Sequence, residues 1–181
     1  MTLTTSMKEF ILHWGEMGTR WGVNRTVAQV HALLYLSAES LTAEDIADAL
    51  SVARSNVSTS LKELQNWSLV QTDSRMGDRR DYFRTSADVW TLFLTVVDQR
   101  VEREIIPTMT MLQRLVVAAR AERPAQPAVT ARITAMQLFL EELHGWYTQI
   151  SKLPPTSLRS LVNAGSNITR FLPKSRRKRL D

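Results

Sequence analysis

The 181-residue sequence contains no cysteine, which excludes disulfide frameworks, thiolate metal sites and cysteine nucleophiles and fits a reducing cytosol. It also lacks any uninterrupted apolar run close to the ~20 residues that a membrane-spanning helix needs. The first helical segment is interrupted by Lys8, Glu9 and His13, so the apolar core of a signal peptide is missing. We therefore expect a cytoplasmic protein without membrane insertion.

The sequence has little of what common catalytic sites require. Its three histidines, His13, His31 and His144, are isolated from one another, and neither a paired-histidine metal motif nor a glycine-rich phosphate loop occurs. Isolated histidines in helical segments are usually packing or surface residues. We expect no enzyme activity, no metal site and no cofactor.

Length and composition indicate a folded protein whose charge is unevenly distributed. A chain of 181 residues with 44% hydrophobic and 23% charged residues can form one domain, or a small domain with added oligomerisation helices. The net charge is +5, of which the terminal segment PKSRRKRLD supplies five positives and one negative, or +4, leaving +1 for the rest. The net charge of the whole chain is therefore weak evidence for a nucleic-acid partner, and the local placement of basic residues is the better guide.

The stretch Thr42–Thr85 has the order of a winged helix-turn-helix. Thr42 with Asp45 three positions on approximates a capping box at the start of AEDIADAL. After a turn at Ser51–Val52, a second helix has a buried stripe of Val57, Leu61 and Leu64, spaced i, i+4 and i+7. The fold class that this order predicts is mainly α with a small β-hairpin.

The outer face of that second helix is polar and carries hydroxyls, an amide and basic groups. At about 100° per residue, Ser55, Thr59 and Lys62 point away from the apolar stripe. Such a face suits insertion into a DNA major groove. A solvated surface helix remains the alternative, because most polar helix faces meet only water.

A hairpin with a basic tip follows. Leu69–Val70 is predicted to open one strand, Tyr82–Phe83 lies in the returning strand, and Met76–Asp78 supplies the turn. Arginines gathered at such a tip can contact phosphates or the narrow minor groove; here they are Arg75, Arg79 and Arg80. The alternative is a solvated turn in which Asp78 pairs locally with an arginine.

Long helices are predicted after the hairpin. Thr85 or Ser86 can cap the first of them, and Pro107 should kink or divide it. Between Ala128 and Leu153, apolar residues advance by three or four positions, close to a coiled-coil seam and long enough to predict a dimer interface: Ile133, Met136, Leu140, Leu143, Tyr147 and Ile150. We therefore expect a homodimer.

Three segments together resemble the GbsR-like branch of the MarR family of bacterial transcription regulators: GEMGTRWG, LTAEDIADALSVARSNVSTSLKELQNWSLV and GDRRDYFRTSADVW. The resemblance implies a homodimeric winged-helix protein, usually a repressor, that binds a pseudo-palindromic operator on double-stranded DNA and dimerises through its terminal helices. Some members of the branch are linked to choline or glycine betaine metabolism. Ser51 and Ser68 depart from the family, which commonly has glycine there.

The resemblance also assigns residues and boundaries. The expected regions are a DNA-binding domain over 1–86, a helical dimerisation region over 87–172 and a basic tail over 173–181. The matching recognition-helix and wing positions, with Arg75 added from the basic tip, give this set of DNA-binding candidates: Arg54, Ser55, Asn56, Ser58, Thr59, Lys62, Arg75, Arg79 and Arg80. Family wings use the residue at Asp78 to orient the arginines.

Two alternatives stay open. The same helical face could dock another protein while the wing remains solvated, which would make the chain a protein-interaction module. Separately, the aromatic-rich segments around Trp14, Trp21 and Trp90 could form a pocket for a small-molecule effector, and a quaternary amine would suit such rings. These tryptophans could equally fill the core.

Overall fold

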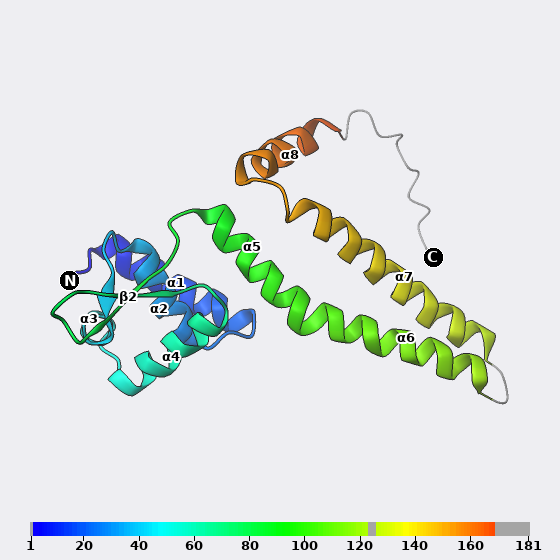
Figure 1. The fold of residues 1–181 in the computed structure, drawn as a ribbon, viewed down its shortest axis with the longest axis horizontal. Coiled ribbons are helices and arrows are strands. Elements are labelled where there is room, and N and C mark those ends of the chain that lie inside the picture. Colours follow the sequence, from blue (N-terminus) through cyan, green and yellow to red (C-terminus); the bar gives the residue numbers. More distant parts are fainter. Residues whose placement is uncertain (1, 123–125, 169–181) are drawn as a thin grey trace. The chain divides into compact units, whose positions relative to one another are not determined.

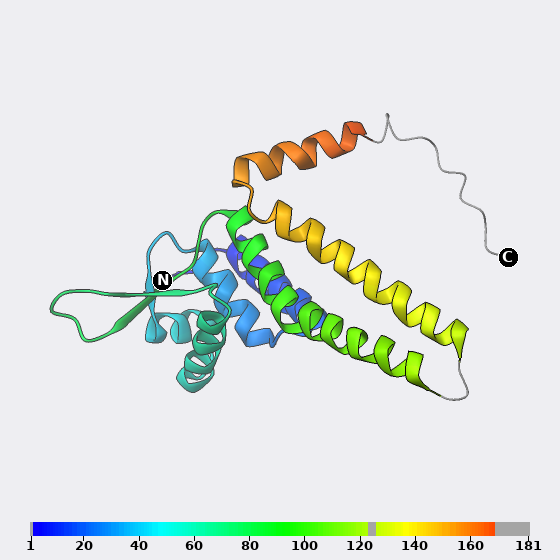
Figure 2. The same cartoon turned by 45° about the vertical axis from the view of Figure 1, so that its right-hand side comes forward.

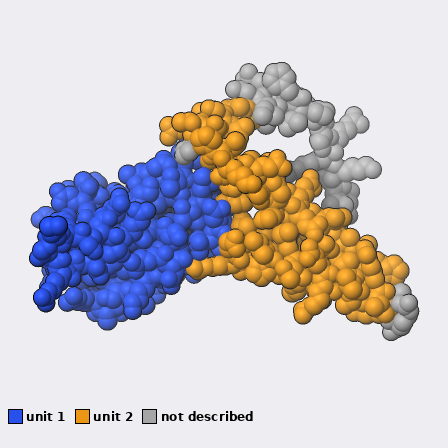
Figure 3. Space-filling model, viewed as in Figure 1, with its two compact units in different colours: residues 1–100 blue, residues 101–181 orange. Residues whose placement is uncertain are grey.

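The structure is a computed structural model that describes residues 2–122 and 126–168. It is mainly helical with one three-stranded antiparallel sheet, which confirms the predicted fold class (Figure 1). The chain divides into two compact units, Met1–Arg100 and Val101–Asp181 (Figure 3). The basic tail expected at 173–181 lies outside the described residues.

Unit 1 contains the helix-turn-helix and the wing. Its elements in chain order are α1 (Thr5–Arg20), α2 (Arg25–Leu36), β1 (Leu41–Thr42), α3 (Ala43–Leu50), α4 (Arg54–Asn66), β2 (Gln71–Ser74), β3 (Asp81–Arg84) and α5 (Val89–Arg100).

The core of unit 1 lies where α2, α3 and α4 meet. The predicted α4 stripe is fully buried, and it packs with residues of α2 and with Ile46 of α3 in one hydrophobic cluster. A continuous apolar contact of this kind fixes the orientation of α4, because rotating the helix would move its polar face into the core. The face opposite the stripe is therefore held toward the outside.

The start of α3 is built as the sequence predicts. The Thr42 side chain accepts from the Asp45 backbone N–H, while the Asp45 carboxylate accepts from the Thr42 N–H at 2.9 Å. The Thr42 hydroxyl also donates to Asp45 Oδ2 at 2.6 Å, and this bond, followed by the one from the Thr42 N–H, holds the pKa of Asp45 below its ordinary value. The capping box at Thr42 is thus confirmed.

Two serines occupy left-handed backbone conformations at the ends of α3 and α4. Ser51 has φ of 54° and Ser68 has φ of 57°. These are the two positions at which the resemblance implies glycine, the residue that adopts this conformation without steric cost. The turn geometry is therefore kept despite the serine side chains.

The small sheet has the strand order β1-β3-β2, with all neighbours antiparallel. Two sequence expectations need correction here. Leu69–Val70 do not open the strand, which begins at Gln71; both residues are instead buried in the core. The first turn of α5 is capped by Asp88, whose carboxylate accepts from the Thr91 N–H at 2.9 Å, and not by Thr85 or Ser86.

Unit 2 is a helical hairpin followed by a shorter helix. Its elements are a π-helical turn η1 (Val101–Ile105), α6 (Ile106–Ala121), α7 (Pro127–Ile150) and α8 (Pro155–Ile168). The π turn ends at Ile105, two residues before Pro107, which lacks the N–H that a regular helix would use there. The predicted division of the long helix at Pro107 is confirmed.

Within unit 2, α6 packs on α7 through Leu112, Val116 and Ala119, which are buried. Across residues 2–122 and 126–168, no helix is both long enough and apolar enough to cross a membrane.

Candidate nucleic-acid interface

The predicted reading face of α4 is exposed along its length. Its buried residues Val57, Ser60, Leu61 and Leu64 lie on the opposite side. The six candidates on the helix are all exposed, namely Arg54, Ser55, Asn56, Ser58, Thr59 and Lys62. This helix of 13 residues thus presents polar and basic groups along one side while the other side is fixed in the core.

The N-terminus of α4 has no side-chain cap, because Ala53 occupies the N-cap position. Ser55 and Thr59 are linked within the helix, since the Thr59 hydroxyl donates to the Ser55 carbonyl at 3.1 Å. Near the other end, the Gln65 amide donates to the Thr72 hydroxyl at 2.7 Å. This last bond joins α4 to β2, so the helix and the wing form one connected surface.

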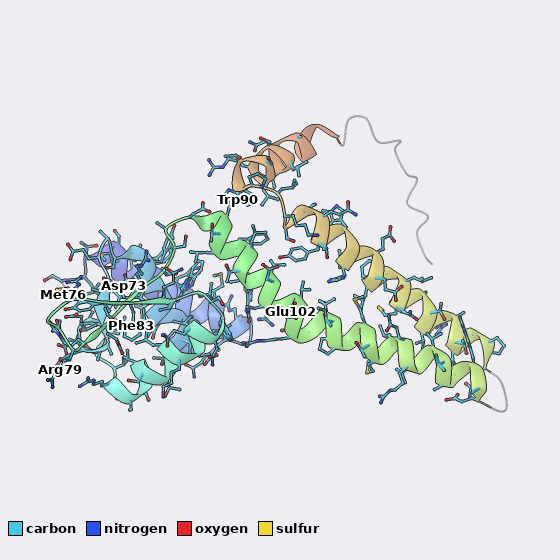
Figure 4. All side chains as sticks on the ribbon, in the orientation of Figure 1. Asp73, Met76, Arg79, Phe83, Trp90 and Glu102 are labelled. Carbon is cyan, nitrogen blue, oxygen red and sulfur yellow. The ribbon has the colours of Figure 1, made fainter. Side chains whose placement is uncertain are left out.

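The wing projects from the body of unit 1 as a β2–β3 hairpin (Figure 2). Met76 and Arg79 lie at its tip, whereas Phe83 lies further along β3 (Figure 4). Gly77, with φ of 80°, makes the turn possible. An ion pair between Arg84 Nε and Asp73 Oδ2 at 2.7 Å joins the two strands.

Asp78 binds one of the three wing arginines closely. Its carboxylate accepts from Arg80 Nε at 3.0 Å and from Arg80 Nη2 at 2.6 Å, and it also accepts from the Tyr82 hydroxyl at 2.7 Å. The bonds from Arg80 and then from Tyr82 hold the pKa of Asp78 well below its ordinary range, and the same carboxylate raises the pKa of Arg80. Arg80 is thus charged and fixed in direction.

The other two wing arginines differ from Arg80 and from each other. The Arg75 guanidinium lies 3.8 Å from the centre of the Tyr82 ring, a cation–π contact, and Arg75 Nη2 is 3.4 Å from the Ser40 hydroxyl. Arg79 is exposed and has no hydrogen-bond or ion-pair partner among the described residues. The three arginines therefore comprise one held by a carboxylate, one stacked on a ring and one that is unengaged.

Tyr82 is the site residue that the sequence did not reveal. Its pattern predicted only a strand residue, whereas the structure places its hydroxyl on Asp78 and Arg80 and its ring under Arg75. The available signal was its position two residues after Arg80 on β3, since alternate residues of a strand share a face.

The base of the wing is anchored to the core through a buried histidine. The Thr85 hydroxyl donates to the Leu69 carbonyl at 2.6 Å, so its oxygen is left to accept from Nε2 of His31, 3.4 Å away. Burial lowers the pKa of His31 from 6.5 to about 4. His31 is therefore neutral at physiological pH and acts as a packing residue with one polar contact.

The three tryptophans suggested for an effector lie in different surroundings. Trp14 stacks on Phe10 with ring centroids 5.3 Å apart, and it packs against the core. Trp90 meets Phe93 edge to face. Trp21 is 62% exposed. No ring contact joins any two of the three within the described residues, so they do not form one aromatic cage.

The predicted seam on α7 is divided between two faces. Ile133, Leu140 and Tyr147 are half-buried, whereas Met136 and Leu143 are exposed. Four large apolar residues make up the exposed stripe, which we call the α7 stripe: Met136, Phe139, Leu143 and Trp146, exposed by 53, 57, 42 and 60%.

Comparison with known proteins agrees with this geometry. Residues 21–81, which span the helix-turn-helix and most of the wing, match the MarR family. A solved structure described as a transcriptional regulator is 25% identical with a TM-score of 0.60, and the match covers 81% of this chain and 95% of that one. No curated protein matches the chain.

Looser likenesses occur to MepR of Staphylococcus aureus. MepR described as a transcription regulator of the multidrug efflux pump MepA is 14% identical over 94% of this chain and 100% of its own, with a TM-score of 0.37. A MepR–DNA complex is 20% identical over 64% and 91%, also at 0.37.

Proposed function

We propose that the chain is a sequence-specific DNA-binding transcription regulator of the MarR type, acting as a homodimeric repressor. The observation that carries the proposal is the exposed polar face of α4 beside a wing with an unengaged arginine, both fixed on one core. The match of this same segment to the MarR family supports it.

In this proposal the two parts of the surface have different tasks. Arg79, Arg80 and Lys62 supply the salt-dependent affinity for phosphates, while hydroxyls and the Asn56 amide on α4 contact base edges or nearby phosphates. Asp78 fixes Arg80 in one direction, which lowers the entropy that Arg80 loses on binding. The wing is therefore prepared for DNA before contact.

Dimerisation belongs to the proposal because a single reading helix covers only half of a pseudo-palindromic operator. Two copies must present their α4 helices ~34–36 Å apart to reach successive major grooves on one side of the duplex. The α7 stripe supplies an apolar surface for such pairing. Membership of the GbsR-like branch and control by a quaternary amine remain predictions; titrating purified protein with choline while following tryptophan fluorescence tests the second.

The test of DNA binding is selection of bound fragments from random duplexes, followed by measurement of the affinity at several salt concentrations. We expect a steep fall of affinity with salt, and Arg79→Gln should reduce the slope of log K against log salt by about 1. Arg114→Gln, which removes the same charge from exposed α6, is the matched control and should leave the slope unchanged. Salt-independent retention, or no enriched fragment, would favour a protein-interaction module instead.

A further inference from the structure

The central line of the α4 reading face contains a single methyl group. Taking the buried stripe as reference, Ser55, Thr59, Lys62 and Asn66 lie roughly 140–200° around the helix from it, which places them on the outermost line. Ser55 and Asn66 end in polar groups and Lys62 in an ammonium. Thr59 is the only residue on this line, and the only exposed one on α4, that ends in a methyl group.

The hydroxyl of Thr59 is already engaged. It donates its proton to the Ser55 carbonyl at 3.1 Å, within the same helix. The hydroxyl therefore has no proton to offer a base acceptor such as guanine O6 or N7. What Thr59 retains for a partner is its Cγ2 methyl and the lone pairs of Oγ1.

Among the base edges of the major groove, only thymine presents a methyl group, at C5. We propose that Thr59 is a specificity-determining residue that selects thymine through contact between its Cγ2 methyl and the thymine C5 methyl. The inference rests on the proposed function and adds to it the identity of one base that α4 reads. The polar residues on the same line, Ser55, Lys62 and Asn66, then contact phosphates and the hydrogen-bonding edges of bases.

The experiment replaces methyl groups on both sides of the contact. Each thymine of a selected operator is changed in turn to deoxyuridine, which keeps every hydrogen-bonding group and removes only the C5 methyl. We expect the wild-type protein to lose about fourfold in affinity at one position per half-site, the effect of burying one methyl-sized group. When that base pair is changed to C·G, the duplex with 5-methyldeoxycytidine should bind more tightly than the duplex with deoxycytidine.

Three variants identify the protein partner of that methyl. Thr59→Ser keeps the hydroxyl and its bond to Ser55 but removes the methyl, so it should bind thymine and deoxyuridine duplexes equally at that position. Thr59→Val keeps a methyl and loses the hydroxyl, so it should retain the thymine preference. Thr110→Ser is the control, because it removes a methyl from an exposed threonine of α6 whose hydroxyl likewise donates to the carbonyl four residues earlier, at 3.1 Å, and it should behave as wild type.

The inference is overturned if Thr59→Ser keeps the full deoxyuridine penalty, or if no thymine of the operator responds to removal of its methyl. Both results require that the wild-type protein binds the operator, so they are distinct from failure of the proposed function, which would appear as absence of selective, salt-dependent binding. Thr59 is exposed, and agreement of the thermal unfolding midpoints of the three variants with wild type verifies that a lost preference does not reflect a lost fold.

Discussion

Ser51 and Ser68 hold backbone conformations that cost an L-residue roughly 1–2 kcal/mol. Both are exposed, so removing their side chains sacrifices little packing. We predict that Ser51→Gly and Ser68→Gly each raise the free energy of unfolding by about 1 kcal/mol, somewhat offset by the greater freedom of glycine in the unfolded chain. Urea denaturation measures this change.

The matched control for the two serines is Ser58→Gly, made at an exposed position inside α4 with ordinary helical dihedrals. There the same substitution should lower the free energy of unfolding by about 0.5 kcal/mol, since glycine is a poorer helix former than serine. Destabilisation at Ser51 and Ser68 similar to that at Ser58 would show that their side chains contribute more than their backbone strain costs.

His31 makes stability depend on pH in a defined window. Its pKa is about 4 when folded against 6.5 as the ordinary value, so between these two the unfolded chain binds the extra proton. The contribution of His31 to the free energy of unfolding is therefore fully present above pH 6.5. It is lost as pH falls toward 4, by about 3 kcal/mol in total.

The measurement is a series of urea unfolding curves between pH 7 and pH 5.5, a range that ends about one unit above the ordinary pKa of glutamate. We predict that the free energy of unfolding falls with pH in the wild type and that the slope largely disappears in His31→Gln. The glutamine keeps an N–H donor for Thr85 and does not titrate. An equal slope in both proteins would mean that His31 is not the responsible group.

At the scale of elements, α3 and α4 begin in opposite ways. Thr42 and Asp45 cap α3 reciprocally, whereas Ala53 offers α4 no side-chain acceptor although its backbone has the extended conformation of an N-cap. We predict that Ala53→Ser raises the free energy of unfolding by roughly 0.5–1 kcal/mol, and that Thr42→Ala lowers it by about 1 kcal/mol. Thermal unfolding followed by circular dichroism compares them.

If Ala53→Ser failed to stabilise the protein, the first N–H groups of α4 would be hydrogen-bonded to water about as favourably as to a serine hydroxyl. The comparison with Thr42→Ala makes that outcome informative, because the two sites measure the same type of bond in adjacent helices of one core.

The elements that sequence reasoning predicted correctly are those determined locally. The α4 stripe follows from helical spacing and the Thr42 cap from residues three apart, and Pro107 interrupts its helix through its own ring. The two-residue strand β1 could not be predicted, because it exists only by pairing with β3 some forty residues later. Likewise, Tyr82 acquires its role from a turn that brings Asp78 back to it.

The distribution of apolar residues on α7 was predicted only in part, since periodicity gives a stripe but not its partner. Helix α6 packs on α7, whose residues Ile133, Leu140 and Tyr147 are half-buried while Met136 and Leu143 are exposed. The exposed side then continues over Phe139 and Trp146, which the sequence reading did not include. Which face is free depends on how the hairpin of α6 and α7 closes, a tertiary property.

For the whole molecule, the α7 stripe gives dimerisation a direct test. Four large apolar side chains spaced by three, four and three residues form a helical seam that a second copy can cover. We predict that Leu143→Glu, which puts a charge in the middle of this seam, converts the proposed homodimer to a monomer in sedimentation equilibrium. Thr110→Glu adds the same charge at an exposed position of α6, outside the α7 stripe, and should leave the dimer intact.

Loss of the dimer should also change DNA binding in a specific way. A monomer retains one α4 and one wing, so its affinity for a single half-site should be close to that of wild type at equal reader concentration, while the advantage of the full operator, where the second reader binds at high effective concentration, should disappear. Leu143→Glu that remains dimeric would exclude the α7 stripe as the seam. A monomer that still prefers the full operator would instead show that the two readers pair through DNA alone.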